Sequence, residues 1–226
     1  MTRGILYIVW GGYEKRVDAA LDKSIASIKA IHPELPYTVH RLPEGSTLLD
    51  KAAMCDISPY DETLFLDADT VVLDRLDYGF EKAAKHGIAI CICECPWARR
   101  YTCCGEGDAI EYNCGIIWFT KSAKPVFDRW QELNKTIDSS IIFRTTDGLR
   151  RMGLNDQAGF TLAIEELNFN PWVLPLNFNF RPIWHKTWFG QIKIWHDYSD
   201  VPDEFREVNQ GQIESGRVVD FVRDAE

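Results

Sequence analysis

Two hydrophobic patterns alternate along the chain: short runs of consecutive apolar residues, and longer stretches with apolar residues every three or four positions. The first pattern is typical of buried strands and the second of amphipathic helices. The short runs predict strands at residues 4–10, 37–42, 62–66, 87–93, 114–119 and 191–195. The longer stretches predict helices at residues 13–30, 51–55, 76–85, 123–133 and 155–167.

Strands separated by helices indicate βαβ units, and therefore an α/β fold with a mostly parallel central sheet. A chain of 226 residues has the size of one such domain, so we predict a single domain over residues 1–226. Residues 96–112 show little periodicity and much polarity, which predicts a long loop, and loops of that length often carry function. The polar segment from about residue 202 predicts a loosely held C-terminal tail.

Composition and charge exclude several classes of function. The chain has 25 Lys and Arg against 34 Asp and Glu, a formal net charge of −9, and phosphate backbones require a basic face, so we expect no nucleic-acid partner. No apolar run reaches the roughly 20 residues of a membrane span. The first residues combine a short apolar run with early charges, which is atypical of a signal peptide. We therefore expect a cytoplasmic protein.

Seven cysteines do not indicate a disulfide framework, because the number is odd and the chain is not small. Cys91, Cys93 and Cys95 alternate with other residues, so their thiols would lie on one face of a strand. Structural zinc sites usually separate paired ligands by about two to four residues, whereas a single residue separates these cysteines. We predict that they are buried as small hydrophobic side chains.

A pair of carboxylates follows the strand predicted at residues 62–66. Asp67 and Asp69 are two positions apart, so in an extended chain both side chains would point the same way. Such neighbours repel each other unless a cation lies between them, and a hard divalent cation with oxygen ligands would remove that repulsion. Because ligands of open α/β sheets bind beyond the carboxyl ends of the strands, we predict a metal site here. The alternative is a turn in which both residues cap local backbone groups.

His196 ends the last predicted strand and is a candidate third metal ligand. By the period of two, Ile192, Ile194 and His196 share one face of the strand, while Lys193 and Trp195 share the other. The apolar face therefore ends in an imidazole on the ligand side of the sheet. A histidine with a purely structural role fits the same pattern.

Four motifs occur in an order that resembles nucleotide-sugar glycosyltransferases of the GT-A fold, most closely those of family 8, such as glycogenin and bacterial galactosyltransferases. The motifs are Phe65-Leu-Asp-Ala-Asp-Thr70, Tyr112-Asn-Cys-Gly-Ile-Ile-Trp-Phe119, Asn155-Asp-Gln157 and Ile192-Lys-Ile-Trp-His196. The resemblance extends from the first strand to His196. It implies a GT-A fold, and an enzyme that moves a sugar from a nucleotide-diphosphate sugar to a hydroxyl acceptor such as a glycan.

The resemblance also implies roles for individual residues. Asp67, Asp69 and His196 would bind a Mn²⁺ or Mg²⁺ ion that bridges the donor diphosphate, and Asp156 and Gln157 would lie near the reacting carbon. The residues that would bind the nucleotide or the donor sugar are Val9, Gly11, Tyr13, Lys51, Asp67, Ala68, Asn113 and Gly115. The long loop could close over the donor or bind the acceptor. Likeness to family 8 favours retention of the anomeric configuration.

Two features depart from the family pattern. The first loop, Trp10-Gly-Gly-Tyr13, has no acid before Tyr13, so the resemblance does not extend to uridine as the base. Tyr13 could stack on the base or pack on the core. The family's late histidine is commonly followed by Gly and then a Lys that contacts phosphate, whereas Asp197-Tyr-Ser-Asp200 follows here. Lys193 would face away from His196. Other candidate sources of the missing cation are Arg181, His185 and Lys186.

Asp156 has two interpretations. Asn155 precedes a helical pattern and predicts an N-cap, which would put Asp156 at the first helical position, where the helix dipole stabilises its carboxylate. A structural role at the helix start fits this position. A catalytic role also fits, because a carboxylate stabilises an oxocarbenium-like carbon. If Asp156 is not catalytic, the next candidates are Gln157, Asp108 and Glu111.

Two other functions are compatible with the same residues. Asp67-Ala-Asp-Thr-Val71 resembles the nucleophile loop of haloacid-dehalogenase-type phosphatases, in which the first Asp attacks phosphorus. In those proteins the loop usually follows the first strand, whereas here it follows a long stretch of chain. Eight Trp and eight Tyr could supply the stacking surfaces of a carbohydrate-binding module. However, Trp10, Trp118 and Trp195 fall in predicted strands, where positions in the core explain them.

Overall fold

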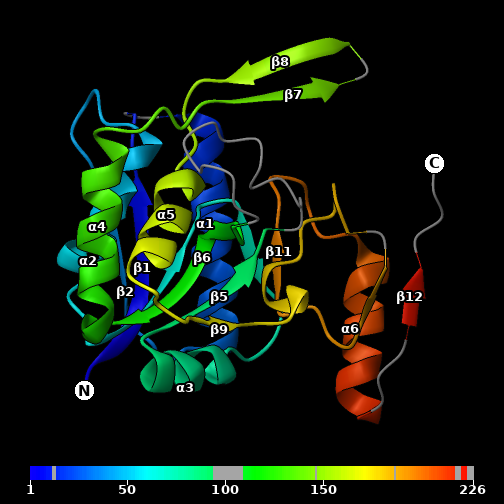
Figure 1. The fold of residues 1–226 in the computed structure, drawn as a ribbon. Coiled ribbons are helices and arrows are strands. Elements are labelled where there is room, and N and C mark those ends of the chain that lie inside the picture. Colours follow the sequence, from blue (N-terminus) through cyan, green and yellow to red (C-terminus); the bar gives the residue numbers. More distant parts are fainter. Residues whose placement is uncertain (12–13, 94–108, 146, 186, 217–219, 223–226) are drawn as a thin grey trace.

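The computed structural model describes the whole chain except residues 12–13, 94–108, 146, 186, 217–219 and 223–226 (Figure 1). Its centre is a six-stranded sheet in the order β2-β1-β3-β6-β5-β9. The strands are β1 (Arg3–Val9), β2 (Tyr37–Arg41), β3 (Glu62–Leu66), β5 (Ile88–Ile92), β6 (Tyr112–Thr120) and β9 (Trp172–Val173). Strand β1 pairs in parallel with β2 and β3, and β5 with β9, whereas β6 runs antiparallel to β3 and β5.

Helices cover both faces of this sheet. They are α1 (Lys15–Ile31), α2 (Met54–Ile57), α3 (Asp77–His86), α4 (Lys124–Asn134) and α5 (Gln157–Glu166), with short 3-10 helices η1 (Leu48–Ala53), η4 (Lys121–Ala123) and η5 (Leu176–Asn179). Along β3, Phe65 packs with residues of α4 and α5, while Leu64 and Leu66 pack on the opposite side with residues of α1 and α3. Because both faces are buried, the central strands are continuous apolar runs, as the sequence predicted.

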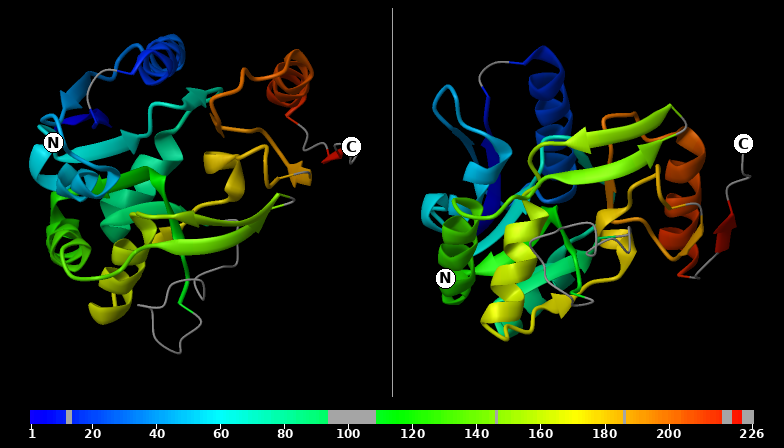
Figure 2. Two further views of the ribbon diagram at one scale, coloured as in Figure 1. Left: turned by 90° about the horizontal axis from the view of Figure 1, so that it is seen from above. Right: turned by 45° about the horizontal axis from the view of Figure 1, so that its top comes forward.

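A short antiparallel pair continues the chain beyond this sheet. Strand β4 (Thr70–Val72), which the sequence did not predict, pairs with β11 (Ile194–His196), and His196 lies opposite Thr70. The predicted strand at 191–195 is thus shorter than expected. Next to β11 lie helix α6 (Asp203–Ser215) and the antiparallel pair β10 (Thr187–Phe189) and β12 (Asp220–Val222), at one side of the molecule in all views (Figures 1 and 2).

Helix α6 corrects the predicted loose tail. Phe205 is buried there and stacks on Trp188, with ring centroids 5.0 Å apart. The other buried residues of this helix are Asn209 and Gln212, so its inner face has helical spacing but is mostly polar. Asn209 donates and accepts backbone hydrogen bonds at Ile192, each 2.7 Å long, which satisfies its buried amide. The sequence of this helix therefore shows no apolar periodicity from which a helix could be predicted, although the helix packs on the domain.

The sequence also did not predict a β-hairpin between α4 and α5. Strands β7 (Ile141–Thr145) and β8 (Gly148–Met152) form an antiparallel pair at the end of the molecule toward which β1 points (Figures 1 and 2). Ile142 and Leu149 are exposed, whereas Ile141 at the start of β7 is buried, so the described side chains of the hairpin do not form the continuous buried face that makes a strand recognisable. None of the helices in the described part of the chain has the length and apolar content of a membrane span.

Candidate functional site

The two carboxylates of the Asp-x-Asp motif lie at the carboxyl end of β3. The chain does not stay extended there: Asp67 follows the strand, and Ala68 and Asp69 form a turn that leads into β4. The backbone N–H of Asp67 donates to the carbonyl of Gly115 on β6 (2.7 Å), and the carbonyl of Asp69 accepts from the N–H of Asp197 (2.9 Å). The turn is therefore anchored both to the central sheet and to the segment after β11.

His196 reaches these carboxylates through the pairing of β4 with β11. One ligand atom from each of Asp67, Asp69 and His196 can be chosen so that all three lie within 4.8 Å of one another. The Nε2 atom of His196 is 3.5 Å from Oδ1 of Asp69. The three residues that the sequence proposed as metal ligands are thus brought together, although more than a hundred residues of chain separate Asp69 from His196.

Asn179, a residue that the sequence analysis did not consider, orients the imidazole. The Nδ1 atom of His196 lies 2.8 Å from Oδ1 of Asn179, and both side chains are buried. Because an amide oxygen only accepts hydrogen bonds, Nδ1 carries a hydrogen, and Nε2 is the ring nitrogen that faces the carboxylates. With a hydrogen, Nε2 can donate to Asp69; without it, Nε2 offers its lone pair to a metal. A histidine that ligates a metal needs this arrangement.

Gly115 allows the side chains of His196 and Asp67 to lie directly against the backbone of β6. A Cβ atom at this position would lie 2.4 Å from Cε1 of His196 and 2.7 Å from Oδ2 of Asp67, so any other residue would displace the cluster. Two carboxylates and a neutral imidazole form a donor set that suits a hard or borderline divalent cation. The residues present therefore fit a divalent metal ion.

A network of three buried hydroxyl groups connects the turn at residues 67–69 to β1 and α1. The Tyr7 hydroxyl lies 2.9 Å from Ser24 Oγ, which lies 2.9 Å from Thr70 Oγ1. The Thr70 hydroxyl donates to the backbone carbonyl of Asp67 (2.9 Å). All three side chains are buried, so this network ties the turn rigidly to β1 and α1.

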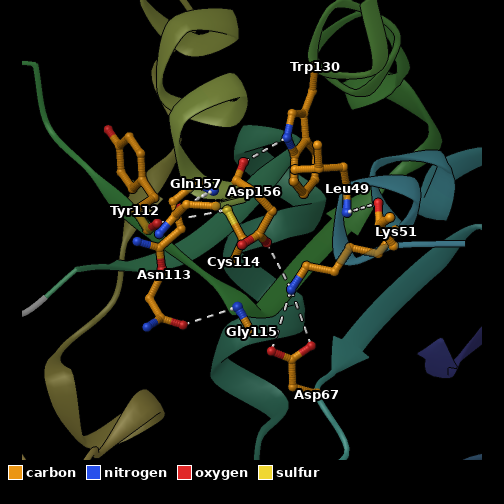
Figure 3. Close-up of polar contacts among 12 residues, drawn as sticks. Leu49, Lys51, Asp67, Tyr112, Asn113, Cys114, Gly115, Trp130, Asp156 and Gln157 are labelled. Atoms are coloured by element: carbon orange, nitrogen blue, oxygen red, sulfur yellow. Dashed lines mark hydrogen bonds and ion pairs between the residues drawn. The ribbon is translucent and has the colours of Figure 1, made fainter. Parts of the chain in front are cut away.

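Lys51 connects the carboxylate cluster with the start of α5 (Figure 3). Its ammonium group is buried, and lies 3.3 Å from Oδ1 of Asp67 and 2.8 Å from Oδ2 of Asp156. Burial by itself would lower the pKa of Lys51, but the carboxylates of Asp156 and Asp67 raise that pKa above its ordinary value. The ammonium group therefore stays protonated at neutral pH and balances part of the negative charge of the site.

The two aspartates of the motif differ in their pKa. Burial raises the pKa of Asp67 despite the nearby ammonium of Lys51. Burial also raises the pKa of Asp69, but the hydrogen bond and the charge of His196 lower it, so the pKa of Asp69 lies below its ordinary value. A metal-free site therefore disfavours charge on Asp67, and a cation would relieve this cost.

The start of α5 places Asp156 and Gln157 in the same site. The helix begins at Gln157, two residues after the predicted start at residue 155, and Oδ1 of Asn155 accepts from the Gln157 N–H (2.8 Å). The N-cap is therefore Asp156 and not Asn155, although the side chain of Asn155 does accept a hydrogen bond from the first helical N–H, and the Asp156 carboxylate is turned toward Lys51. The indole N–H of Trp130 donates to the backbone carbonyl of Asp156 (2.9 Å) and holds the helix start in place (Figure 3).

Asn113 contacts Gly115, and Gln157 contacts Glu111, the residue that precedes β6. The side-chain oxygen of Asn113 accepts from the N–H of Gly115 (3.0 Å), and Asn113 is buried. The amide nitrogen of Gln157 donates to the carboxylate of Glu111 and lies 3.7 Å from Sγ of Cys93. Glu111, a reserve candidate in the sequence analysis, therefore belongs to the site through Gln157.

A pocket of about 260 Å³ opens next to the carboxylates. It is lined by Ile8, Val9, Trp10, Glu14, Val17, Asp67, Ala68, Asp69 and Tyr198. Val9 and Ala68 were among the predicted binding residues, and Gly11 follows directly after Trp10. Tyr13 lies outside the described residues, so its proposed stacking role stays a prediction.

Sequence reasoning missed Trp10 and Tyr198 as pocket residues. Trp10 packs partly against the core, as predicted, but also lines the pocket. Tyr198 stands two residues after His196, in the segment that lacks the family's lysine. The guanidinium carbon of Arg16 lies 4.1 Å from the centroid of the Tyr198 ring. An aromatic residue so close to a candidate ligand was the available signal.

The candidate phosphate-binding cations are partly placed. Lys193 forms an ion pair with Asp74, so it faces away from the site, as predicted. Arg181 follows Phe180, whose backbone carbonyl accepts from the N–H of His196 (2.8 Å), and His185 Nδ1 accepts from the N–H of Arg181 (3.0 Å). This turn therefore lies close to the cluster, whereas Lys186 is outside the described residues.

Among the cysteines, Cys91 and Cys93 are buried, which confirms the prediction for these two. The thiol of Cys91 lies 3.3 Å from the backbone carbonyl of Pro175. Cys95 and Asp108, with most of the predicted loop, lie outside the described residues.

Solved glycosyltransferase structures have a similar fold. The galactosyltransferase LgtC, in complex with donor and acceptor sugar analogues, matches with a TM-score of 0.58 and 15% identity, over 92% of this chain and 95% of its own. Mouse xyloside xylosyltransferase 1, in the apo form, matches with a TM-score of 0.55 and 16% identity, over 89% and 100%. The glycosyltransferase GlyE of Streptococcus pneumoniae TIGR4 matches with a TM-score of 0.54 and 12% identity, over 100% and 66%.

These similarities confirm the predicted fold class: the chain has a GT-A fold, an α/β structure in which helices flank a six-stranded central sheet. At such low identity they establish the fold alone. No protein-family model matches the sequence, and no curated protein sequence matches it either. The protein's function therefore has to be inferred from the residues of the site.

Proposed function

We propose that this protein is a metal-dependent glycosyltransferase, which transfers a sugar from a nucleotide-diphosphate sugar to a hydroxyl group of an acceptor such as a glycan. The observation that carries the proposal is the cluster of Asp67, Asp69 and His196 beside a pocket at the carboxyl ends of β1 and β3. Ligands of open α/β sheets bind at this edge. The galactosyl- and xylosyltransferase activities named for proteins of similar fold support the same class of reaction.

The donor nucleotide would lie in the pocket, over Val9, Gly11 and Ala68, with Tyr198 as an aromatic wall. The cluster would hold the metal ion, for which we propose Mn²⁺ or Mg²⁺. When bound, this ion would stabilise as a Lewis acid the negative charge that develops on the leaving diphosphate.

The chain's own residues would act on the sugar. The anomeric carbon becomes positively charged as its bond to the diphosphate breaks, and carboxylates and carbonyl dipoles stabilise it. Asp156 and Gln157 would supply this stabilisation: Lys51 links the carboxylate of Asp156 to the cluster, and Gln157 is the next residue, at the start of α5. Asn113 and Gly115 would border the donor sugar. The resemblance to family 8 favours retention of the anomeric configuration.

Neither alternative function gains comparable support. A haloacid-dehalogenase-type phosphatase would need no histidine beside Asp67 and Asp69, yet His196 is oriented toward them. A carbohydrate-binding module would use exposed aromatic rings, whereas Trp118 and Trp195 are buried. The single domain and the cytoplasmic location stay predictions from the sequence.

A panel of nucleotide sugars tests the proposal. Melting temperature and donor hydrolysis would be measured for each nucleotide sugar, with Mn²⁺, with Mg²⁺ and with a chelator. We expect one group of donors to raise the melting temperature only with metal, and the same donors to be hydrolysed slowly or transferred to added acceptors. Asp69→Ala should remove both effects. Metal-independent hydrolysis of a simple phosphomonoester, without activity on any nucleotide sugar, would favour the phosphatase instead.

A further inference from the structure

One buried acid contacts the site without a role in the reaction proposed above. Glu111 precedes β6 and is 4% exposed. Its backbone carbonyl accepts from the N–H of Cys93 (2.7 Å), which anchors it to the end of β5. Its carboxylate accepts a hydrogen bond from the side-chain nitrogen of Gln157. A buried carboxylate is costly to desolvate, so a contact of this kind needs an explanation.

The backbone of Gln157 is already fixed by other groups. Its N–H donates to Asn155, and the preceding carbonyl accepts from Trp130. What these contacts leave open is the direction of the side-chain amide. The two ends of an amide have nearly the same shape but opposite polarity, since the oxygen accepts and the nitrogen donates.

Glu111 determines which end of the amide faces which way. A carboxylate only accepts hydrogen bonds, so it selects the nitrogen of Gln157, and hydrogen bonds to a charged acceptor are the stronger ones. Sγ of Cys93 lies 3.7 Å from the same nitrogen and is a weak acceptor, which agrees with this orientation. The carbonyl oxygen of Gln157 is consequently the end turned away from Glu111.

We propose that Glu111 is a positioning residue, which turns the carbonyl oxygen of Gln157 toward the donor sugar. This inference rests on the proposed function. A carbonyl oxygen presents negative partial charge to the anomeric carbon as that carbon becomes positive, whereas a flipped amide would present its hydrogens and oppose the reaction. Glu111 acts through Gln157 and does not itself touch the donor.

A carboxylate–amide exchange tests the orientation. Glu111→Gln replaces an acceptor by a group that can also donate, so both orientations of Gln157 become populated, and kcat should fall by about twofold or more with KM for the donor unchanged. Gln157→Glu faces one carboxylate with another, and kcat should fall by at least about tenfold. In the double variant the amide of Gln at position 111 donates to one carboxylate oxygen at position 157, and the other oxygen faces the sugar. Its kcat should be about tenfold higher than that of Gln157→Glu.

The matched control is Glu165→Gln, which removes the same charge from an exposed position near the end of α5. We expect its kcat to equal that of the wild type. A second measurement needs no turnover: the side-chain amide protons of Gln157, identified by their absence in Gln157→Glu, should shift upfield in the NMR spectrum of Glu111→Gln and stay unchanged in Glu165→Gln.

The outcomes separate the two proposals. The positioning role alone is overturned if the wild type is active but the double variant shows no recovery of kcat. It is also overturned if the Gln157 amide signals do not shift in Glu111→Gln. A wild type without activity on any nucleotide sugar overturns the proposed function and this inference together. Recovery in the double variant, with the expected amide shift, supports the positioning role, because a merely structural contact would not restore kcat.

Discussion

The cluster of Asp67, Asp69 and His196 and the β7–β8 hairpin place glycine residues in opposite surroundings. Gly148 in the hairpin turn has a φ of 117°, and a Cβ there would meet no atom within 4 Å, so its role is conformational. Gly115 lies in a regular strand, where a Cβ would collide with His196 and Asp67. The comparison indicates that the cluster tolerates no added atom at Gly115, whereas the turn of the hairpin has room for a side chain at Gly148 and restricts only the backbone conformation there. Substitutions should therefore have large effects in the first region and small effects in the second.

The largest effect is expected for Lys51→Met. This substitution leaves the carboxylates of Asp67 and Asp156 buried without their cation, which should lower the free energy of unfolding by about 3–5 kcal/mol. Lys124→Met is the matched control, because Lys124 also contacts two carboxylates but its side chain is 48% exposed, against 3% for Lys51. Its loss should stay below about 1 kcal/mol. Urea unfolding of both variants measures the difference, and equal losses would contradict the importance of burial.

Gly115→Ala should abolish metal binding. A ligand present at 100 times its Kd stabilises a protein by roughly 2.7 kcal/mol, and this variant should lose that gain on addition of Mn²⁺. Gly211→Ala is the control, because a Cβ at that position in α6 would meet nothing within 4 Å. Melting curves with and without Mn²⁺ measure the effect, and the metal-free curve verifies folding. A normal Mn²⁺ response in a folded Gly115→Ala protein would show that the metal binds elsewhere.

Asn179→Leu should weaken metal binding without removing a ligand. Loss of the hydrogen bond to His196 Nδ1 frees the ring and its tautomer, and such changes typically cost about 10–100-fold in metal affinity. Asn179→Asp keeps an acceptor and should bind Mn²⁺ about as well as the wild type. Calorimetric titration with Mn²⁺ compares the two. Equal affinities for the leucine and aspartate variants would remove Asn179 from the support of the site.

The smallest effect is expected in the hairpin. Ile142 and Leu149 are 62% and 66% exposed, so replacing each with Ser should change the free energy of unfolding by no more than about 0.5 kcal/mol. Mn²⁺ binding should be unchanged. Denaturant melts and the same titration provide the measurement. A loss above 1 kcal/mol would mean that the hairpin packs more tightly than its exposure indicates, and the contrast between the two regions would weaken.

Neighbouring residues explain which parts of the fold the sequence predicted. The strands around Leu64 and Trp118 are buried on both faces, so their apolar runs are unambiguous. Helix α6 escaped prediction because its buried positions are mostly polar, and the hairpin because apolar positions such as Ile142 and Leu149 are exposed. Hydrophobic periodicity reports burial, and it does not report structure that is held by polar contacts.

The sequence by itself determined the alternation of strands and helices, the pair of carboxylates after β3 and the ordered motifs that resemble GT-A enzymes. Those features depend on residues that are neighbours in the sequence, and their local interactions do not require the tertiary structure. Only the tertiary structure decided that His196 faces Asp69, that Asn179 orients it, and that Glu111 contacts Gln157. Each of these contacts joins segments at least 17 residues apart, and their partners are chosen by strand pairing and packing rather than by local pattern.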